Sequence, residues 1–253
     1  MKAVLRWIVL ALLAGLALQL YFAGRIALML VLDPQSTAFQ RSEIYRVASE
    51  KGALPWRQQW VPYAAISDNL KKAVIASEDA TFVEHEGVDV EALEKAWEKN
   101  TKSEQRAEQN ASRLASGAAP AGSSKTQAKE PKIVGGSTIT QQLAKNLFLS
   151  GERTLMRKGQ ELLLTLLLEA LLSKQRILEI YLNNVEWGEG VFGAEAAAQY
   201  YYRKSAARLS AYEAARLAVM LPRPKYFETR PGSGYLASRA GTIAARMGGV
   251  EVP

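Results

Sequence analysis

The N-terminal end of the chain carries its longest apolar run. From Trp7 to Gly24 the only polar residue is Gln19, and after Arg25 the apolar residues continue to Leu32. A helix needs about 20 apolar residues to cross the hydrocarbon core of a bilayer. This stretch is therefore long enough to form a membrane-spanning helix.

The residues that flank this run set its expected orientation. Lys2 and Arg6 precede it, and basic residues beside a membrane helix favour the cytoplasmic side. A cleaved signal peptide is the alternative, but its apolar core is shorter and 23–25 makes a poor cleavage site. We expect a cytoplasmic N-terminus and an uncleaved single-pass anchor over 1–35, with 36–253 as one domain on the outer side.

The rest of the chain is dominated by helical periodicity. Apolar residues recur at three- and four-residue steps, whereas few stretches alternate with period two. We expect a polar link up to about Glu43 and helices over 67–84, 88–97, 194–202, 205–221 and 235–247, with two more that begin near Thr138 and Ser173. Another helix contains 157–161 and is apolar nearly all round over 162–172. The predicted fold class is therefore mainly α.

The composition changes between residues 100 and 132. This segment consists mostly of Ala, Ser, Gly, Gln, Lys and Glu, and Leu114 is its only large apolar residue. It can bury too little apolar surface to offset the entropy that ordering would cost. We expect a mobile low-complexity insert over 100–132.

The overall composition excludes some kinds of site and suggests the charge of the binding partner. The chain has no cysteine, so disulfides, thiolate metal sites and cysteine nucleophiles are excluded. Its formal net charge of +7 suggests an anionic partner, which is a nucleic acid, an anionic membrane surface or a phosphorylated ligand. Because the N-terminus is predicted to lie in a membrane, we favour a membrane-linked anionic ligand and expect no nucleic acid.

The segment from Ser77 to Gly87 combines an acidic pair, an aromatic side chain and the only histidine. Read as a helix that Gly87 ends, it places Glu78, Phe82 and His85 on one face. A carboxylate beside an apolar ring is partly desolvated, which raises its basicity and suits it to proton transfer. The structural alternative is an amphipathic helix end with a charged surface.

A second motif follows the insert at 135–146. Its two glycines precede Thr138, and Thr138 with Gln141 fits a capping box, so a helix begins there. The N–H groups of a first helical turn lack partners and form an anion site. Gln142 and Lys145 would add an amide and a cation, a set that fits a pyrophosphate. A plain glycine hinge and helix start is the alternative.

A third motif places Glu161 four residues after Arg157, on the same helical face. Lys158 adds a second cation. These residues form either a surface salt bridge, worth a few tenths of a kcal/mol, or a phosphate site that contains a second carboxylate.

Together the motifs resemble those of the peptidoglycan glycosyltransferases, glycosyltransferase family 51, and in particular its monofunctional biosynthetic transglycosylases. The resemblance covers about residues 40–247 and follows the family's order. The matching segments are 78–87, 135–146, 157–161, 177–193 and 217–224. No transpeptidase domain follows the last motif, which implies the monofunctional form.

The resemblance implies a lysozyme-like helical fold with a membrane-facing jaw, anchored in the bacterial inner membrane with its catalytic domain in the periplasm. The donor would be a growing glycan on undecaprenyl pyrophosphate, and the acceptor would be lipid II. Other cell-wall synthesis or division proteins are further expected partners.

The resemblance also implies residue roles. Glu78 would be the general base that takes a proton from the acceptor hydroxyl, and the donor carbon would be inverted. Glu161 would be the second catalytic carboxylate, on the pyrophosphate side, either holding a divalent cation (Mg²⁺ or Mn²⁺) or orienting phosphates. Substrate-binding positions would be Asp79, Phe82, His85, Ser137, Thr138, Gln141, Gln142, Lys145, Asn146, Arg157 and Lys158.

Two other functions compete with this one. A lysozyme-like hydrolase would also use a catalytic glutamate, but it has no need of the segment 135–146 or of the basic pair at 157–158. A membrane-anchored scaffold would need neither.

Overall fold

The computed structural model describes residues 2–52, 55–115, 136–149, 151 and 154–253, and the side chains of these residues except 110–115. Contacts divide the chain into two units. The first is Met1–Val88 with Thr138–Pro253, and the second is Asp89–Ser137. We describe each by itself.

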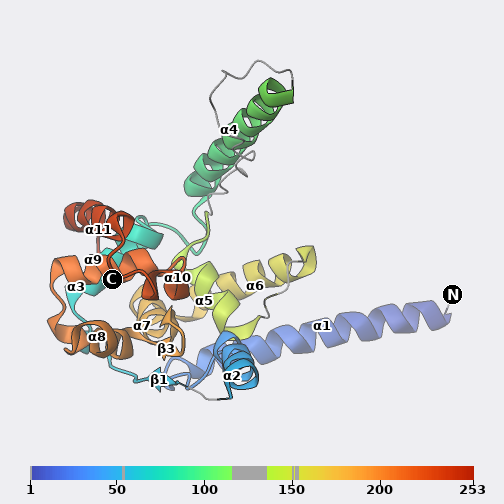
Figure 1. Cartoon of the computed structure of the whole chain (residues 1–253). Helices are drawn as coiled ribbons and strands as arrows, with labels where there is room; N and C mark the ends of the chain where they lie inside the picture. The colour runs from blue at the N-terminus through green and yellow to red at the C-terminus, as the bar shows by residue number, and fades with distance from the viewer. Residues whose placement is uncertain (1, 53–54, 116–135, 150, 152–153) are drawn as a thin grey trace. The chain divides into compact units, whose positions relative to one another are not determined.

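The first unit is mainly helical, as predicted (Figure 1). Its α-helices are α1 (Lys2–Leu28), α2 (Ala38–Lys51), α3 (Asp68–Glu78), α5 (Ile139–Phe148), α6 (Leu155–Leu171), α7 (Lys174–Asn184), α8 (Ala194–Tyr202), α9 (Ala211–Met220), α10 (Pro224–Glu228) and α11 (Gly234–Arg246). Short 3-10 turns cover Tyr63–Ala65, Ala206–Arg208 and Met247–Gly249.

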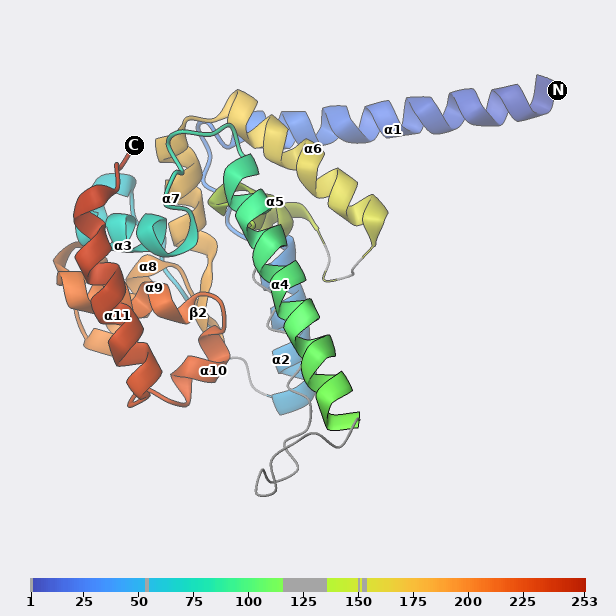
Figure 2. The same ribbon diagram turned by 90° about the horizontal axis from the view of Figure 1, so that it is seen from above.

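The core forms where α3, α9 and α11 pack together, and both views show these helices side by side (Figure 1, Figure 2). The apolar stripe of α3 supplies Leu70, Val74 and Ile75, which are all buried. Trp187 and Tyr181 are also fully buried. Burying such stripes is the main favourable contribution to the stability of a helical domain.

A small sheet lies beside these helices. It contains β1 (Arg57–Gln58), β2 (Glu186–Gly188) and β3 (Val191–Phe192) in the order β1-β3-β2. β1 pairs with β3 in parallel, and β2 pairs with β3 antiparallel. Gly190, which connects β2 to β3, has φ +71°, and a Cβ there would lie 1.7 Å from the Pro55 carbonyl oxygen. Only glycine fits this approach.

Helix α1 confirms the expected apolar helix. Its most apolar stretch is long enough to cross a membrane, and none of that stretch is buried. The helix contacts α6, where the side-chain amides of Gln19 and Gln160 each donate a hydrogen bond to the other, at 2.9 and 3.2 Å. Further along, Arg176 donates to the Met29 carbonyl oxygen at 2.8 Å.

Three expected boundaries in this unit were wrong. Part of the expected polar link is helix α2, which starts at a capping box formed by Thr37 and Gln40. Helix α3 ends at Glu78 rather than near residue 84. The expected helix over 205–221 is divided, because the Ser210 side chain caps a new helix there.

The second unit contains α4 (Val90–Ala115). The helix continues well beyond the expected end at Trp97. Ion pairs between residues four apart, Glu91 with Lys95 and Glu98 with Lys102, support it, and Ala, Glu, Lys and Gln have high helix propensity. The segment 100–115 of the expected insert is therefore helical, and 116–132 lies outside the described residues.

Candidate functional site

Glu78, the last residue of α3, is held by α5. The Gln142 side-chain amide donates a hydrogen bond of 2.9 Å to Glu78 Oε2. The orientation of that amide is fixed in turn, because the Tyr181 hydroxyl donates to Gln142 Oε1 at 2.9 Å. Tyr181 is 1% exposed, so this hydrogen-bonded chain leads from the core to the carboxylate.

The surroundings make Glu78 a stronger base than an exposed glutamate. Burial raises its pKa, the hydrogen bonds from Gln142 and Ser77 oppose this rise, and the nearby Asp79 adds to it. The predicted desolvation of this carboxyl therefore occurs. The expected helical placement was wrong, however, because α3 ends at Glu78 and Phe82 and His85 do not continue it.

A cluster of cations surrounds Glu161 on α6. Arg157 donates to Glu161 Oε2 at 2.9 Å, and Lys158 pairs with Oε1. Glu161 is 4% exposed. Lys145 on α5 interacts electrostatically with Glu161 and with Glu78; desolvation, Arg157 and Lys158 lower its pKa, and the two glutamates oppose this. The charge of Lys145 thus couples the two carboxylates.

An open cavity of about 570 Å³ lies between these elements. Gln142, Lys145, Asn146 and Arg157 form part of its lining. Arg157 Nε is buried and has no hydrogen-bond partner among the described residues. A buried donor of this kind beside a lysine suits an anionic ligand. Glu78 does not line the cavity. It is hydrogen-bonded to Gln142, which does.

The other residues of the first motif form a junction with the start of α5. Asp79 Oδ2 accepts from the Ile139 N–H at 2.9 Å, and its Oδ1 lies 2.9 Å from His85 Nε2. The Gly87 N–H donates to His85 Nδ1 at 3.1 Å, so Nε2 carries the ring proton and donates to Asp79. The Thr138 hydroxyl donates to the Gly87 carbonyl oxygen at 2.7 Å.

This junction corrects the expectation of an open anion site at the start of α5. The Ile139 N–H is taken by Asp79, and the Gln141 N–H donates to the Thr138 hydroxyl within the predicted capping box. Phe82 is fully buried in the core. The structure therefore brings Asp79, Phe82, His85, Thr138 and Gln141 into a supporting layer, whereas Gln142, Lys145, Asn146 and Arg157 line the cavity. Ser137 is exposed, at the last position of the second unit.

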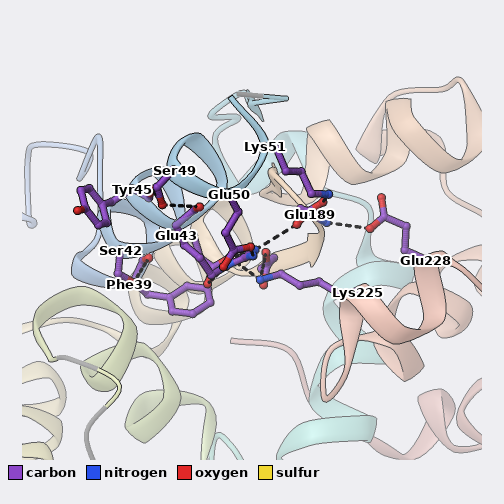
Figure 3. Close-up of polar contacts among 12 residues, drawn as sticks. Phe39, Ser42, Glu43, Tyr45, Ser49, Glu50, Lys51, Glu189, Lys225 and Glu228 are labelled. Atoms are coloured by element: carbon purple, nitrogen blue, oxygen red, sulfur yellow. Dashed lines mark hydrogen bonds and ion pairs between the residues drawn. The ribbon is translucent and has the colours of Figure 1, made fainter. Parts of the chain in front are cut away.

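Sequence reasoning missed one wall of the cavity. Glu43 on α2 and Glu186 on β2 line it, and Lys225 on α10 pairs with both. Figure 3 shows Glu43 and Lys225 pointing toward one another. No local pattern indicated this wall, because its residues are far apart in the sequence.

Comparison with known proteins agrees with this arrangement. A family model described as transglycosylase matches residues 47–119 and 115–248. The chain is 52% identical to the biosynthetic peptidoglycan transglycosylase of Burkholderia thailandensis over 256 residues, which cover 100% of this chain and 90% of the relative. The protein of that name from Burkholderia pseudomallei is 53% identical over 95% of this chain and 84% of its own length. The one from Paraburkholderia phytofirmans is 50% identical over 95% and 89%. The chain therefore belongs to the transglycosylase family and is an enzyme with the lysozyme-like helical fold of that family.

Proposed function

We propose that this chain is a peptidoglycan glycosyltransferase that polymerises lipid II. The observation that carries the proposal is the Gln142 bridge. One side chain of α5 both holds the Glu78 carboxylate and lines a cavity whose other polar residues include Lys145 and Arg157. A base and a phosphate-binding wall thus belong to one site, as transfer from a lipid pyrophosphate requires.

The reaction follows from these groups. Glu78 accepts the proton of the acceptor sugar hydroxyl, whose oxygen forms a bond to the anomeric carbon of the donor. The bond from that carbon to the pyrophosphate oxygen breaks, and the pyrophosphate takes the electron pair. Attack from the face opposite the leaving group inverts the carbon. Lys145 and Arg157 stabilise the charge that develops on the leaving oxygen.

Glu161 has a positioning role in this proposal. Its two oxygens are engaged by Arg157 and Lys158, so it fixes the position of Arg157, which lines the cavity. Asp79, His85 and Thr138 act in the same indirect way, because they fix the start of the helix that carries Gln142 and Lys145.

The residues described around Glu161 do not fit a divalent cation. Mg²⁺ and Mn²⁺ prefer several oxygen ligands, whereas here a single carboxylate faces Lys145, Arg157 and Lys158. We therefore assign no step to a metal. In this proposal the cationic side chains of Lys145 and Arg157, instead of a metal ion, neutralise the pyrophosphate.

The site is proposed to work at a membrane. The donor and the acceptor both carry a lipid chain, so an enzyme anchored by α1 meets them in two dimensions. An inner-membrane location with the catalytic domain in the periplasm agrees with the basic residues before α1. Proteins of cell-wall synthesis or division would be partners there.

The test uses purified full-length chain, labelled lipid II in detergent and separation of the products on a gel. We expect a ladder of glycan strands from the native chain, and a loss of at least about 100-fold in rate for Glu78→Gln, because general-base catalysis contributes that much. Glu84→Gln, a change at an exposed residue nearby, should keep the native rate. Polymer formed by Glu78→Gln at the native rate would remove Glu78 from the role of base. Shortening of added strands without polymer would indicate a hydrolase instead.

A further inference from the structure

The wall formed by Glu43 and Glu186 has no role in the proposed reaction. It belongs to the same cavity as Lys145 and Arg157 but carries acidic and apolar groups. Its apolar members are Phe39, Val185, Leu221, Pro222 and Pro224. The cavity therefore offers phosphate-binding cations and, separately, a surface of a different chemical character.

Glu186 is the unusual residue of this wall. It is 7% exposed, and its Oε1 is buried without a hydrogen-bond donor in the described part of the chain. Lys225 Nζ lies 3.4 Å from Oε1, but its hydrogen bond goes to Glu43. Buried polar atoms in native proteins nearly always have partners. Oε1 has an ion-pair partner in Lys225 but no hydrogen-bond donor, and such a carboxyl oxygen in a cavity wall is suited to accept a hydrogen bond from a ligand.

The charges around Glu186 indicate what kind of donor fits. Burial alone would raise the pKa of Glu43, but hydrogen bonds from Arg46 and Lys225 hold it below the usual value. Arg46 and Lys225 are thus both hydrogen-bonded to Glu43. Burial raises the pKa of Glu186 to about 7, with Lys225 lowering it and Glu43 raising it. Glu186 therefore holds its negative charge less readily than Glu43, so a neutral donor fits it better than a second cation.

The apolar surface favours a sugar as that donor. A pyranose ring has faces made of C–H groups and edges that carry hydroxyl and amide groups. Pro222, Pro224 and Leu221 provide a surface for such a face, and Glu186 provides an acceptor for a polar edge. The phosphates suit the cationic part of the cavity, at Lys145 and Arg157. The sugar would therefore lie in the other part, against the wall that contains Glu186.

We propose that Glu186 is a substrate-binding residue that accepts a hydrogen bond from a hydroxyl or acetamido N–H of an N-acetylated sugar of the glycan. The proposal rests on the proposed function, because it assigns the sugar subsite of that reaction. Val185 and Leu221 line the same cavity, and Glu186 itself is buried, so the hydrogen bond would form in partly apolar surroundings, which strengthen it. Glu43 and Lys225 fix the charge of the wall around it.

Steady-state kinetics with lipid II test the role of the carboxyl. Glu186→Ala is expected to raise KM about tenfold, the loss typical of one hydrogen bond to a carboxyl, with a smaller change in kcat. Glu186→Gln keeps an acceptor oxygen and should stay within about threefold of the native KM. The matched control is Glu189→Gln, which alters a carboxyl that pairs with Arg46 and Lys51 but does not line the cavity. Inhibition by inorganic pyrophosphate should be unchanged in all three variants.

Binding of a neutral sugar provides a readout that does not depend on turnover. Saturation-transfer NMR with N,N′-diacetylchitobiose should detect binding to the native chain and a loss of the signal in Glu186→Ala. Glu186→Leu, which fills the same volume, replaces that variant if it does not fold.

An unchanged KM together with an unchanged disaccharide signal would overturn the proposal. So would a raised KM for lipid II with normal disaccharide binding, which would indicate recognition of the peptide. A native chain that binds the disaccharide but makes no polymer contradicts only the proposed function.

Discussion

At the scale of single residues, the site depends on a small number of side-chain bonds. Gln142 is central, because it receives the Tyr181 hydroxyl on one side and donates to Glu78 on the other. Its amide cannot change direction without losing one of these bonds. A neutral residue that never titrates therefore limits how far burial raises the pKa of the proposed base.

Removing this amide should change how the rate depends on pH. Burial raises the pKa of Glu78 and the Gln142 hydrogen bond lowers it, so Gln142→Ala raises it further. The base works only when deprotonated, and activity therefore appears at higher pH in the variant. We expect the acidic limb of the kcat/KM profile to move upward. Gln35→Ala, which changes an exposed glutamine, should leave the limb in place. A limb that stays in place in Gln142→Ala would mean that another group titrates in it.

The sequence motifs contain several residues that the structure brings together, whereas their roles stay predictions. Glu78, Gln142, Lys145 and Arg157 were found because each lies in a dense motif. Asp79 was expected to support Glu78, but its contact with Ile139 was not predicted, because it joins residues that are far apart in the chain. The Glu186 wall was missed for the same reason.

At the scale of secondary-structure elements, helix starts followed from local chemistry. The capping side chains of Ser67, Thr138 and Ser173 start α3, α5 and α7 as expected. Helix ends were harder to predict. α3 stops at Glu78 because the Asp79 carboxylate bonds outside the helix, to Ile139 and His85, and periodicity cannot indicate such tertiary contacts.

Gly87 lies against α6, and there is no room for a side chain at this position. Its φ is +84°, and a Cβ there would lie 2.6 Å from Thr165 Cγ2 and 2.9 Å from Glu169 Cγ. Gly87→Ala should lower the free energy of unfolding by about 1–3 kcal/mol, measured by chemical denaturation. The control is Gly241→Ala in α11, where a Cβ meets nothing within 4 Å. That change should raise stability by about 0.5–1 kcal/mol, because alanine suits a helix better. Equal stabilities of the two variants would contradict the assigned strain.

At the scale of the whole molecule, an apolar helix and a basic domain act together. In the proposed membrane location, the formal net charge of +7 would attract the chain to anionic lipid, but the exposed apolar surface of α1 would contribute more to membrane binding. The reciprocal amide bonds between Gln19 and Gln160 also fix the rotation of α1 against α6. The proposed anchor α1 is thus bonded to the same helix that carries Arg157 and Glu161.

This arrangement predicts that the chain resists extraction from membranes. Alkaline carbonate and high salt remove proteins that charge alone holds, whereas a spanning helix remains in the pellet. The native chain is expected in the pellet, with an intact N-terminus by mass spectrometry. A soluble product that lacks residues of α1 would instead indicate a cleaved signal peptide.

The hydrogen bond from Thr138 to the Gly87 carbonyl oxygen has one more consequence. It fastens together the two points at which the chain leaves and re-enters the first unit. Because the first unit already holds these two points together, a longer segment between them adds little to the entropic cost of closing the loop. Each doubling of its length costs only about 0.6 kcal/mol. The segment between Gly87 and the second motif at 135–146 is therefore a position where one insert could be exchanged for another while Glu78, Lys145 and Arg157 keep their places.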